Sequence, residues 1–163
     1  MTDHRDVTLA FKINDAAWKL AAAQRNDPEA DPLFMAELYG FLEVVFGSVV
    51  IVRDDYGSIP SFACQLAQAR QSGFPGPEAP TCNIDDSEGG WSLQLSLDQA
   101  NERITALEFH RGRTGDAPAA DAVVAIDLFL SAFTDELSAR IPKALLWGQL
   151  TVLRPYAVGR GRP

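Results

Sequence analysis

The chain has 163 residues, of which 47% are hydrophobic and 22% are charged, and its formal net charge is −8. This length suits a single domain, and the apolar content excludes general disorder, because enough side chains can be buried to offset the entropy of ordering. The excess of Asp and Glu over Lys and Arg argues against a generic nucleic-acid binder, since phosphate recognition depends on basic side chains.

The N-terminal part of the chain predicts one strand and one short helix. Residues 7–13 alternate apolar and polar side chains, which is the period of a half-buried strand. Residues 15–25 are rich in alanine and follow an Asn-Asp pair that suits a helix N-cap. Residues 26–32 hold two prolines and three acidic residues and are expected to form an exposed loop, whereas 33–39 fits a helix or a strand.

A β-hairpin is predicted in the next segment. Residues 41–46 and 49–53 are mostly β-branched or aromatic, and they are separated by Gly47 and Ser48. Two residues with glycine in the first position are typical of a tight hairpin turn. Residues 54–58, which follow the second strand, are expected to form a turn of their own.

Two principal helices are predicted further along the chain. Pro60 fits the first position of a helix, and we expect this helix to cover about 60–71. Residues 119–141 place apolar side chains three and four positions apart, which is the strongest helical pattern of the chain. Pro142 should end this second helix.

An antiparallel meander is predicted between the two helices, and one more strand after them. Residues 82–85 suit a short strand, 91–97 alternates Trp or Leu with polar residues, and 103–110 alternates again. Residues 111–118 are polar and contain Gly and Pro, so they are expected to form a loop. Residues 145–153 are expected to form the last strand.

The predicted fold class is therefore α+β, with one antiparallel sheet of about five to six strands packed by two principal helices. Residues 1–158 would form a single domain and 159–163 a flexible C-terminal tail. No apolar run approaches the roughly 20 residues of a membrane-spanning helix, and the N-terminus lacks the pattern of a secretory signal. We therefore expect a cytoplasmic protein without a membrane partner, in which Cys64 and Cys82 are free thiols.

Neither a metal nor a cofactor is expected. The sequence has two histidines and no closely spaced pair of Cys or His, which zinc sites use, and it has no glycine-rich phosphate loop. A cysteine hydrolase is one alternative: Cys64 lies near the start of a predicted helix, where the helix dipole lowers the pKa of a thiol, and His110 would be the base. The apolar residues around Cys64 favour a packed cysteine instead.

The acidity is concentrated in the middle of the chain. Residues 27–102 hold thirteen acidic and two basic side chains, whereas the flanking segments are nearly neutral. Such clusters either are solvated loops that keep a protein in solution or form a face that attracts a basic partner. The second hypothesis gives the candidate partner-binding residues Asp54, Asp55, Tyr56, Asp85, Asp86, Glu88 and Trp91.

The order of the predicted elements carries a resemblance to a known group. A hairpin over 40–51 leads into a helix that includes 58–67, followed by a meander with Trp91 and a helix over 129–140. Over about residues 34–140 this order resembles small bacterial immunity proteins of contact-dependent inhibition and polymorphic toxin systems. The resemblance implies a non-enzymatic inhibitor that binds a cognate toxin domain, often a basic nuclease, and occludes its active site.

Another alternative is an acidic mimic of nucleic acid that inhibits a DNA-binding enzyme. This function would require carboxylates at regular spacing on one surface rather than in separate turns. The sequence leaves the oligomeric state open, although an exposed strand edge would support dimerisation.

Overall fold

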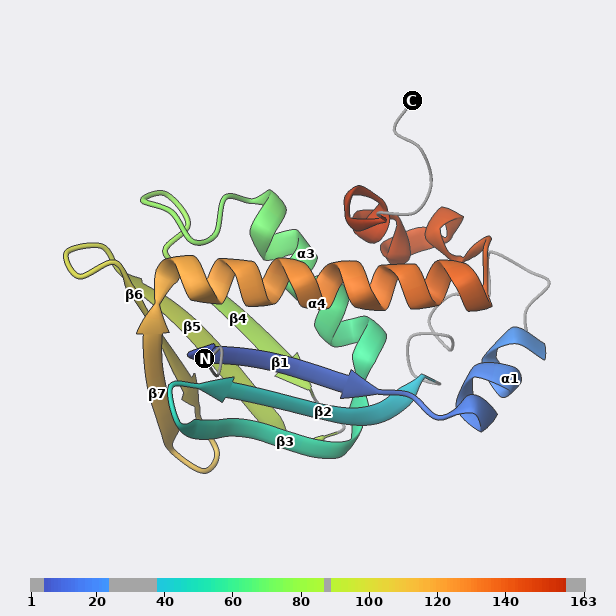
Figure 1. Cartoon of the computed structure of the whole chain (residues 1–163), viewed down its shortest axis with the longest axis horizontal. Helices are drawn as coiled ribbons and strands as arrows, with labels where there is room; N and C mark the ends of the chain where they lie inside the picture. Colours follow the sequence, from blue (N-terminus) through green and yellow to red (C-terminus); the bar gives the residue numbers. More distant parts are fainter. Residues whose placement is uncertain (1–4, 24–37, 87–88, 158–163) are drawn as a thin grey trace.

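The computed structural model describes residues 5–23, 38–86 and 89–157, and Figure 1 shows how their elements are arranged. The predictions for 26–32, for most of 33–39 and for the tail at 159–163 lie outside the described residues. In chain order the elements are β1 (Val7–Lys12), α1 (Asp15–Ala23), β2 (Tyr39–Phe46), β3 (Val49–Ser58), α3 (Ile59–Gln71), β4 (Thr81–Asp86), β5 (Trp91–Asp98), β6 (Arg103–Glu108), β7 (Arg113–Pro118), α4 (Ala119–Arg140) and the 3₁₀ helices η1 (Ala144–Leu146) and η2 (Gly148–Tyr156).

The strands form two antiparallel sheets, with the orders β1-β2-β3 and β4-β5-β6-β7. The fold class is α+β as expected, but the prediction of one sheet with five to six strands is wrong. β7 packs against β2 and β3 without joining their sheet. The approach is close at Gly115 of β7, where an added Cβ would lie 2.6 Å from the backbone O of Phe46. The two sheets therefore meet by packing and not through a shared hydrogen-bond ladder.

β3 is longer than predicted, because residues 54–58 continue the strand instead of turning. This part of β3 pairs with the start of β2, where Gly40 lies opposite Gly57. A side chain at position 40 would collide with the backbone O of Lys12 in β1, so glycine allows the three strands to stay together here. The extension places two of the acidic candidate residues on a strand.

The two principal helices are confirmed as α3 and α4, and each of them contacts both sheets. α4 runs alongside β1 (Figure 1), and α3 packs against both α4 and β4. Phe129 of α4 makes edge-to-face contacts with Phe11 of β1 and Phe62 of α3, at centroid distances of 5.4 and 5.3 Å. Phe62 in turn lies 6.1 Å from Trp91 of β5. This chain of rings connects one sheet to the other through both helices.

β7 was not predicted, because its residues 113–118 are polar and only Ala117 among them is buried. A strand with so little alternation gives no period of two. β7 forms because β6 has an edge without another strand. The two strands pair antiparallel, with Glu108 opposite Arg113 at one end and Arg103 opposite Pro118 at the other.

The strand predicted over 145–153 is also wrong, since this part of the chain forms η1 and η2. Its apolar residues suggested a strand, but the buried side chains recur at every third position. They are Ala144, Trp147, Leu150 and Leu153. A spacing of three residues places side chains on one face of a 3₁₀ helix.

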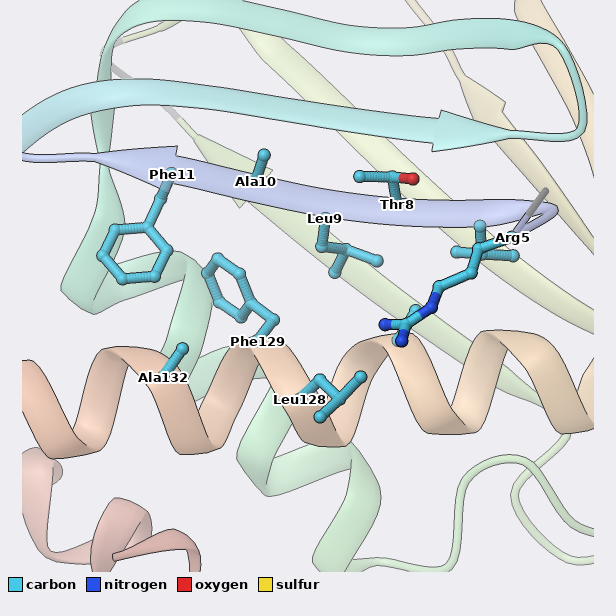
Figure 2. A pocket seen from close by; sticks show the side chains of 10 residues that line it. Arg5, Thr8, Leu9, Ala10, Phe11, Leu128, Phe129 and Ala132 are labelled. Atoms are coloured by element: carbon cyan, nitrogen blue, oxygen red, sulfur yellow. The ribbon is translucent and has the colours of Figure 1, made fainter. Parts of the chain in front are cut away.

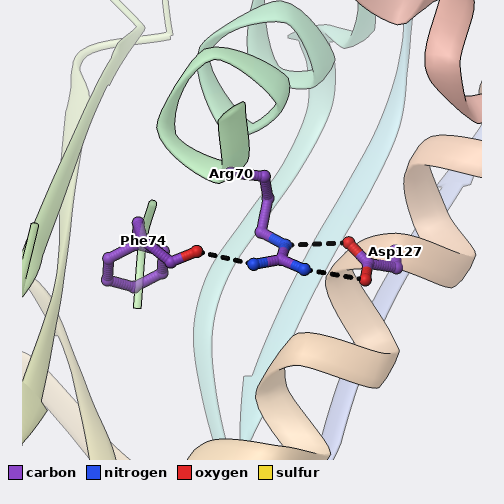
Figure 3. A network of polar contacts seen from close by, with 3 residues as sticks. All are labelled: Arg70, Phe74 and Asp127. Carbon is purple, nitrogen blue, oxygen red and sulfur yellow. Dashed lines mark hydrogen bonds and ion pairs between the residues drawn. The ribbon is translucent and has the colours of Figure 1, made fainter. Parts of the chain in front are cut away.

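Arg70 of α3 forms an ion pair with Asp127 of α4 and so links the two helices (Figure 3). Its Nε and Nη2 donate to the two carboxylate oxygens of Asp127 at 2.9 and 3.0 Å, and its Nη1 donates to the backbone O of Phe74 at 2.7 Å. The hydrogen bonds to Asp127 raise the pKa of Arg70 above its ordinary value. Burial, together with the nearby Asp127 carboxylate, raises the pKa of Tyr156 in η2.

Candidate functional site

Two acidic segments that are far apart in the sequence meet where β3 approaches the turn between β4 and β5. Trp91, the first residue of β5, donates its indole N–H to Asp54 Oδ2 of β3 over 3.0 Å. This hydrogen bond joins the two segments. We call the resulting site the acidic corner, and it comprises Asp54, Asp55, Tyr56, Asp85, Asp86 and Trp91.

Asp54 is fixed on both sides. Its Oδ1 accepts the backbone N–H of Tyr56 at 2.9 Å, while its Oδ2 accepts the indole N–H of Trp91. The β4–β5 turn comes so close that a Cβ at Gly89 would lie 2.5 Å from Asp54 Oδ2. Glycine at position 89 therefore lets the turn close over the carboxylate.

Asp85 and Asp86 are held by different parts of the fold. Asp85 Oδ1 accepts the hydroxyl of Ser92 at 2.6 Å, and the side-chain amide of Gln65 in α3 both donates to Asp85 O and accepts from Asp85 N, each at 3.1 Å. Asp86 Oδ1 accepts the backbone N–H of Gly89 at 2.8 Å, and its Oδ2 accepts that of Ser58 at 3.4 Å. Both carboxylates therefore have defined positions.

The acidic corner offers solvent its carboxylates and one aromatic ring. Asp55 is exposed, and Tyr56 is 78% exposed. Among the described residues, no Lys or Arg forms an ion pair with Asp54, Asp55 or Asp85. The negative charge of these three side chains is therefore available to a partner.

Trp91, another predicted site residue, does not present a surface there. Trp91 is only 7% exposed, because its ring packs against Phe62 in the core. Its part in the corner is to position Asp54 and not to contact a partner with its face. Glu88 lies outside the described residues.

A basic turn that is not among the predicted site residues lies at the same end of the β4–β7 sheet. Glu108 is buried, and its carboxylate accepts the backbone N–H groups of His110 and Arg111 at 2.9 and 2.7 Å. The clamped turn exposes Phe109, His110, Arg111 and Arg113. The backbone N–H of Phe109 bonds to Ser92 O, next to Trp91. The run of basic residues around Gly112 could have indicated this feature in the sequence.

The alternative catalytic pair is not joined by any contact among the described residues. Cys64 is 2% exposed, and its Sγ lies 3.7 Å from the backbone O of Gln149 in η2. His110 is exposed in the β6–β7 turn. Burial raises the pKa of the other thiol, Cys82, to about 11, which favours an unreactive neutral form. The described parts of the chain contain no group of three or more His, Cys, Asp or Glu that could hold a metal ion.

Comparisons of the chain with protein-family models, with curated proteins and with solved structures gave no match. Within the residues described, no helix is both long and apolar enough to cross a membrane. The geometry of the acidic corner therefore carries the functional argument.

Proposed function

We propose that this chain is a non-enzymatic, cytoplasmic inhibitor of the immunity-protein type, which binds a basic toxin domain through the acidic corner and blocks the toxin's active site. The observation that carries the proposal is that Asp54 of β3 and Asp86 of β4 meet at Trp91, which brings the acidic pairs Asp54–Asp55 and Asp85–Asp86 to one corner of the fold. Separate solvated loops would not need a shared, hydrogen-bonded arrangement of this kind.

The fixed positions of the carboxylates support binding. Because Asp54, Asp85 and Asp86 are already held by hydrogen bonds, a partner would lose less entropy in ordering them. Lys and Arg side chains of the partner would then form charge-assisted hydrogen bonds to the remaining lone pairs. The exposed ring of Tyr56 beside them is of the residue type that contributes most at protein interfaces.

The neighbouring basic turn suggests how a partner would be oriented. Because β5 lies between β4 and β6 in the sheet, Asp85 and Asp86 lie on one side of Trp91 and the turn that carries Arg111 and Arg113 lies on the other. A basic patch flanked by acidic residues fits this surface in one direction only. Complementary potentials of this kind set orientation and accelerate encounter.

Co-expression with the protein encoded beside this gene tests the proposal. A basic domain that stops growth when it is expressed alone should be neutralised by this chain and should co-purify with it in a fixed ratio. If every neighbouring product is harmless, or if a toxic one is neither bound nor neutralised, the proposal is wrong.

The Asp55→Lys variant tests the corner itself, because Asp55 is exposed and holds no contact of the corner. Reversing this charge should slow association with the basic partner by about tenfold at low salt, with a smaller loss at high salt. Glu78→Lys is the matched control: it makes the same change of charge in the loop that precedes β4, at the other end of that strand. Equal effects of the two variants would show a general influence of net charge and exclude the corner.

A further inference from the structure

β1 is an outer strand of its sheet and has one open edge. The N–H of Gly47 bonds to Asp6 O at 2.6 Å, and the register from Val7–Phe46 to Lys12–Phe41 has no shift. Along an antiparallel strand, backbone groups point alternately to either side. The N–H and C=O groups at residues 8, 10 and 12 therefore face β2, and those of Val7, Leu9 and Phe11 face the open side.

This edge lacks the features that usually prevent pairing. Between Val7 and Phe11 the sequence has no proline and no charge, and the β1–β2 register has no bulge. Among the described residues, no backbone hydrogen bond joins Val7, Leu9 or Phe11 to another element. Proteins normally blunt or cover such an edge, because it is a template for another strand.

An apolar groove accompanies the open edge. It has a volume of about 330 Å³ and lies between β1 and α4. Figure 2 shows the side chains of Leu9 and Phe11 on one wall and those of Leu128 and Phe129 on the other, with Arg5 at one end of the groove. Val124 and Leu128, one helical turn apart on α4, are 54% and 48% exposed. Apolar side chains exposed in a row beside an open strand indicate an interface.

We propose that β1 pairs antiparallel with β1 of a second copy, around a twofold axis at Leu9. Only residues whose backbone groups face the open side can exchange hydrogen bonds, so Leu9 pairs with its own copy and Val7 pairs with Phe11. This register places Asp6 of each copy directly opposite Lys12 of the other. Both side chains are exposed, and both lie on the face that alternates with the apolar one.

The charges select this register over its neighbours. If the axis moved to Thr8, Asp6 would face Ala10, and if it moved to Ala10, Lys12 would face Thr8, so both ion pairs would be lost. A parallel arrangement would bring like charges side by side, which is unfavourable. The axis at Leu9 is thus the one in which the strand is complementary to itself.

The dimer would join two three-stranded sheets into one of six strands. Because Leu9 and Leu128 line the same groove, the axis also brings the exposed apolar rows of the two α4 helices toward each other. The acidic corner involves β3, at the opposite edge of the sheet, together with β4 and β5 of the other sheet, and takes no part. The proposal therefore does not depend on the proposed function.

Sedimentation of the full chain over a range of concentrations tests the proposal, with charge exchange as its control. Asp6→Lys and Lys12→Asp, each alone, would set like charges opposite one another twice per dimer. Each should raise the dissociation constant of the dimer about tenfold at low salt. The double variant Asp6→Lys/Lys12→Asp restores opposite charges and should return the dissociation constant to within about twofold of the wild type. Glu78→Lys and Lys19→Asp make the same charge changes elsewhere and should have no effect.

Leu9→Pro provides a second test that does not depend on charge. It removes an N–H that faces the open side and leaves the β1–β2 ladder intact, so the variant should become monomeric. Its melting temperature should fall only as far as that of Leu9→Ala, which loses the same packing against the core but keeps the N–H and should still dimerise. A wild type that is monomeric at every concentration overturns the proposal. The open edge of β1 would then be a site for an extended segment of another protein. A dimer that is insensitive to the single charge changes, or one that the double variant does not restore, overturns it as well.

Discussion

Trp91 combines a core ring with a polar tip that organises the acidic corner. Its ring lies against Phe62, and its N–H holds Asp54. Buried tryptophans generally place the indole N–H on an acceptor, since an unpaired donor in the interior is costly. Because the core fixes the Trp91 ring, the indole N–H in turn fixes the Asp54 carboxylate near the surface.

Replacing Trp91 with phenylalanine separates these two roles. Trp91→Phe keeps a ring against Phe62 but removes the donor to Asp54, so the free energy of unfolding should fall by about 1–2 kcal/mol. Urea unfolding measures this change. Asp55→Asn, which alters the adjacent exposed carboxyl, should leave the free energy of unfolding within about 0.5 kcal/mol of the wild type. Equal stability of all three proteins would show that the indole hydrogen bond contributes nothing.

Cys82 predicts a dependence of stability on pH. Burial raises the pKa of its thiol from 9.0 to about 11 in the folded protein. Between these values the unfolded chain loses the thiol proton and the folded chain retains it. Stability is therefore complete below pH 9 and decreases as the pH rises toward 11.

The Cys82→Ala variant isolates this effect from other titrating groups. The free energy of unfolding of the wild type, relative to that of Cys82→Ala, should be constant below pH 9 and should fall by about 2 kcal/mol on approaching pH 11. Urea unfolding at a series of pH values measures the difference. A constant difference across the whole range would contradict the raised pKa.

Among the elements, α3 and α4 are connected by a partly buried ion pair as well as by apolar packing. The guanidinium of Arg70 meets Asp127 through two hydrogen bonds and is less exposed than the Arg103–Asp116 pair on the β6–β7 hairpin. Exposed pairs contribute little to stability, and bidentate pairs shielded from water contribute more.

Double-mutant cycles on the two pairs test this difference. The cycle Arg70→Met with Asp127→Asn should give a coupling energy of about 1–2 kcal/mol. The cycle Arg103→Met with Asp116→Asn should give about 0.5 kcal/mol or less. Thermal or urea unfolding of the four proteins in each cycle supplies the values. A larger coupling in the exposed pair would contradict the assigned role of Arg70.

Elements that bury one regular face could be predicted from the sequence. The β2–β3 hairpin, β5, α3 and α4 all carry apolar side chains at a regular period. These side chains are the ones that contact the core, so the sequence of each element is enough to predict it. β7 could not be predicted, because its place is set by the free edge of β6. The apolar content of 145–153 predicts a strand, whereas the spacing of three between its buried residues is that of a 3₁₀ helix.

At the scale of the whole molecule, sequence clusters indicated which residues of the candidate site are acidic, but not that they meet. The contact of Asp54 with Trp91 depends on how two separate sheets and α3 pack, and no local pattern encodes that arrangement. The same holds for the basic turn beside the corner, which Glu108 fixes through backbone contacts.

The corner and the open edge of β1 lie on opposite sides of the three-stranded sheet. A dimer through β1 would therefore present two corners, one at each end, and each corner would remain accessible to its own partner. The two surfaces have different chemistry: the corner is charged and fixed by side-chain hydrogen bonds, and the edge offers backbone groups above an apolar groove.

The hydrogen bond between Asp54 and Trp91 spans 37 positions of the chain, which has a consequence during synthesis. A ribosome has to reach β5, which begins at Trp91, before the corner can assemble, so a chain interrupted earlier would carry the carboxylates without their arrangement. Partial products would then not compete with finished molecules for a partner. Binding at the corner would thus report that translation has passed β5 and that the two sheets have come together.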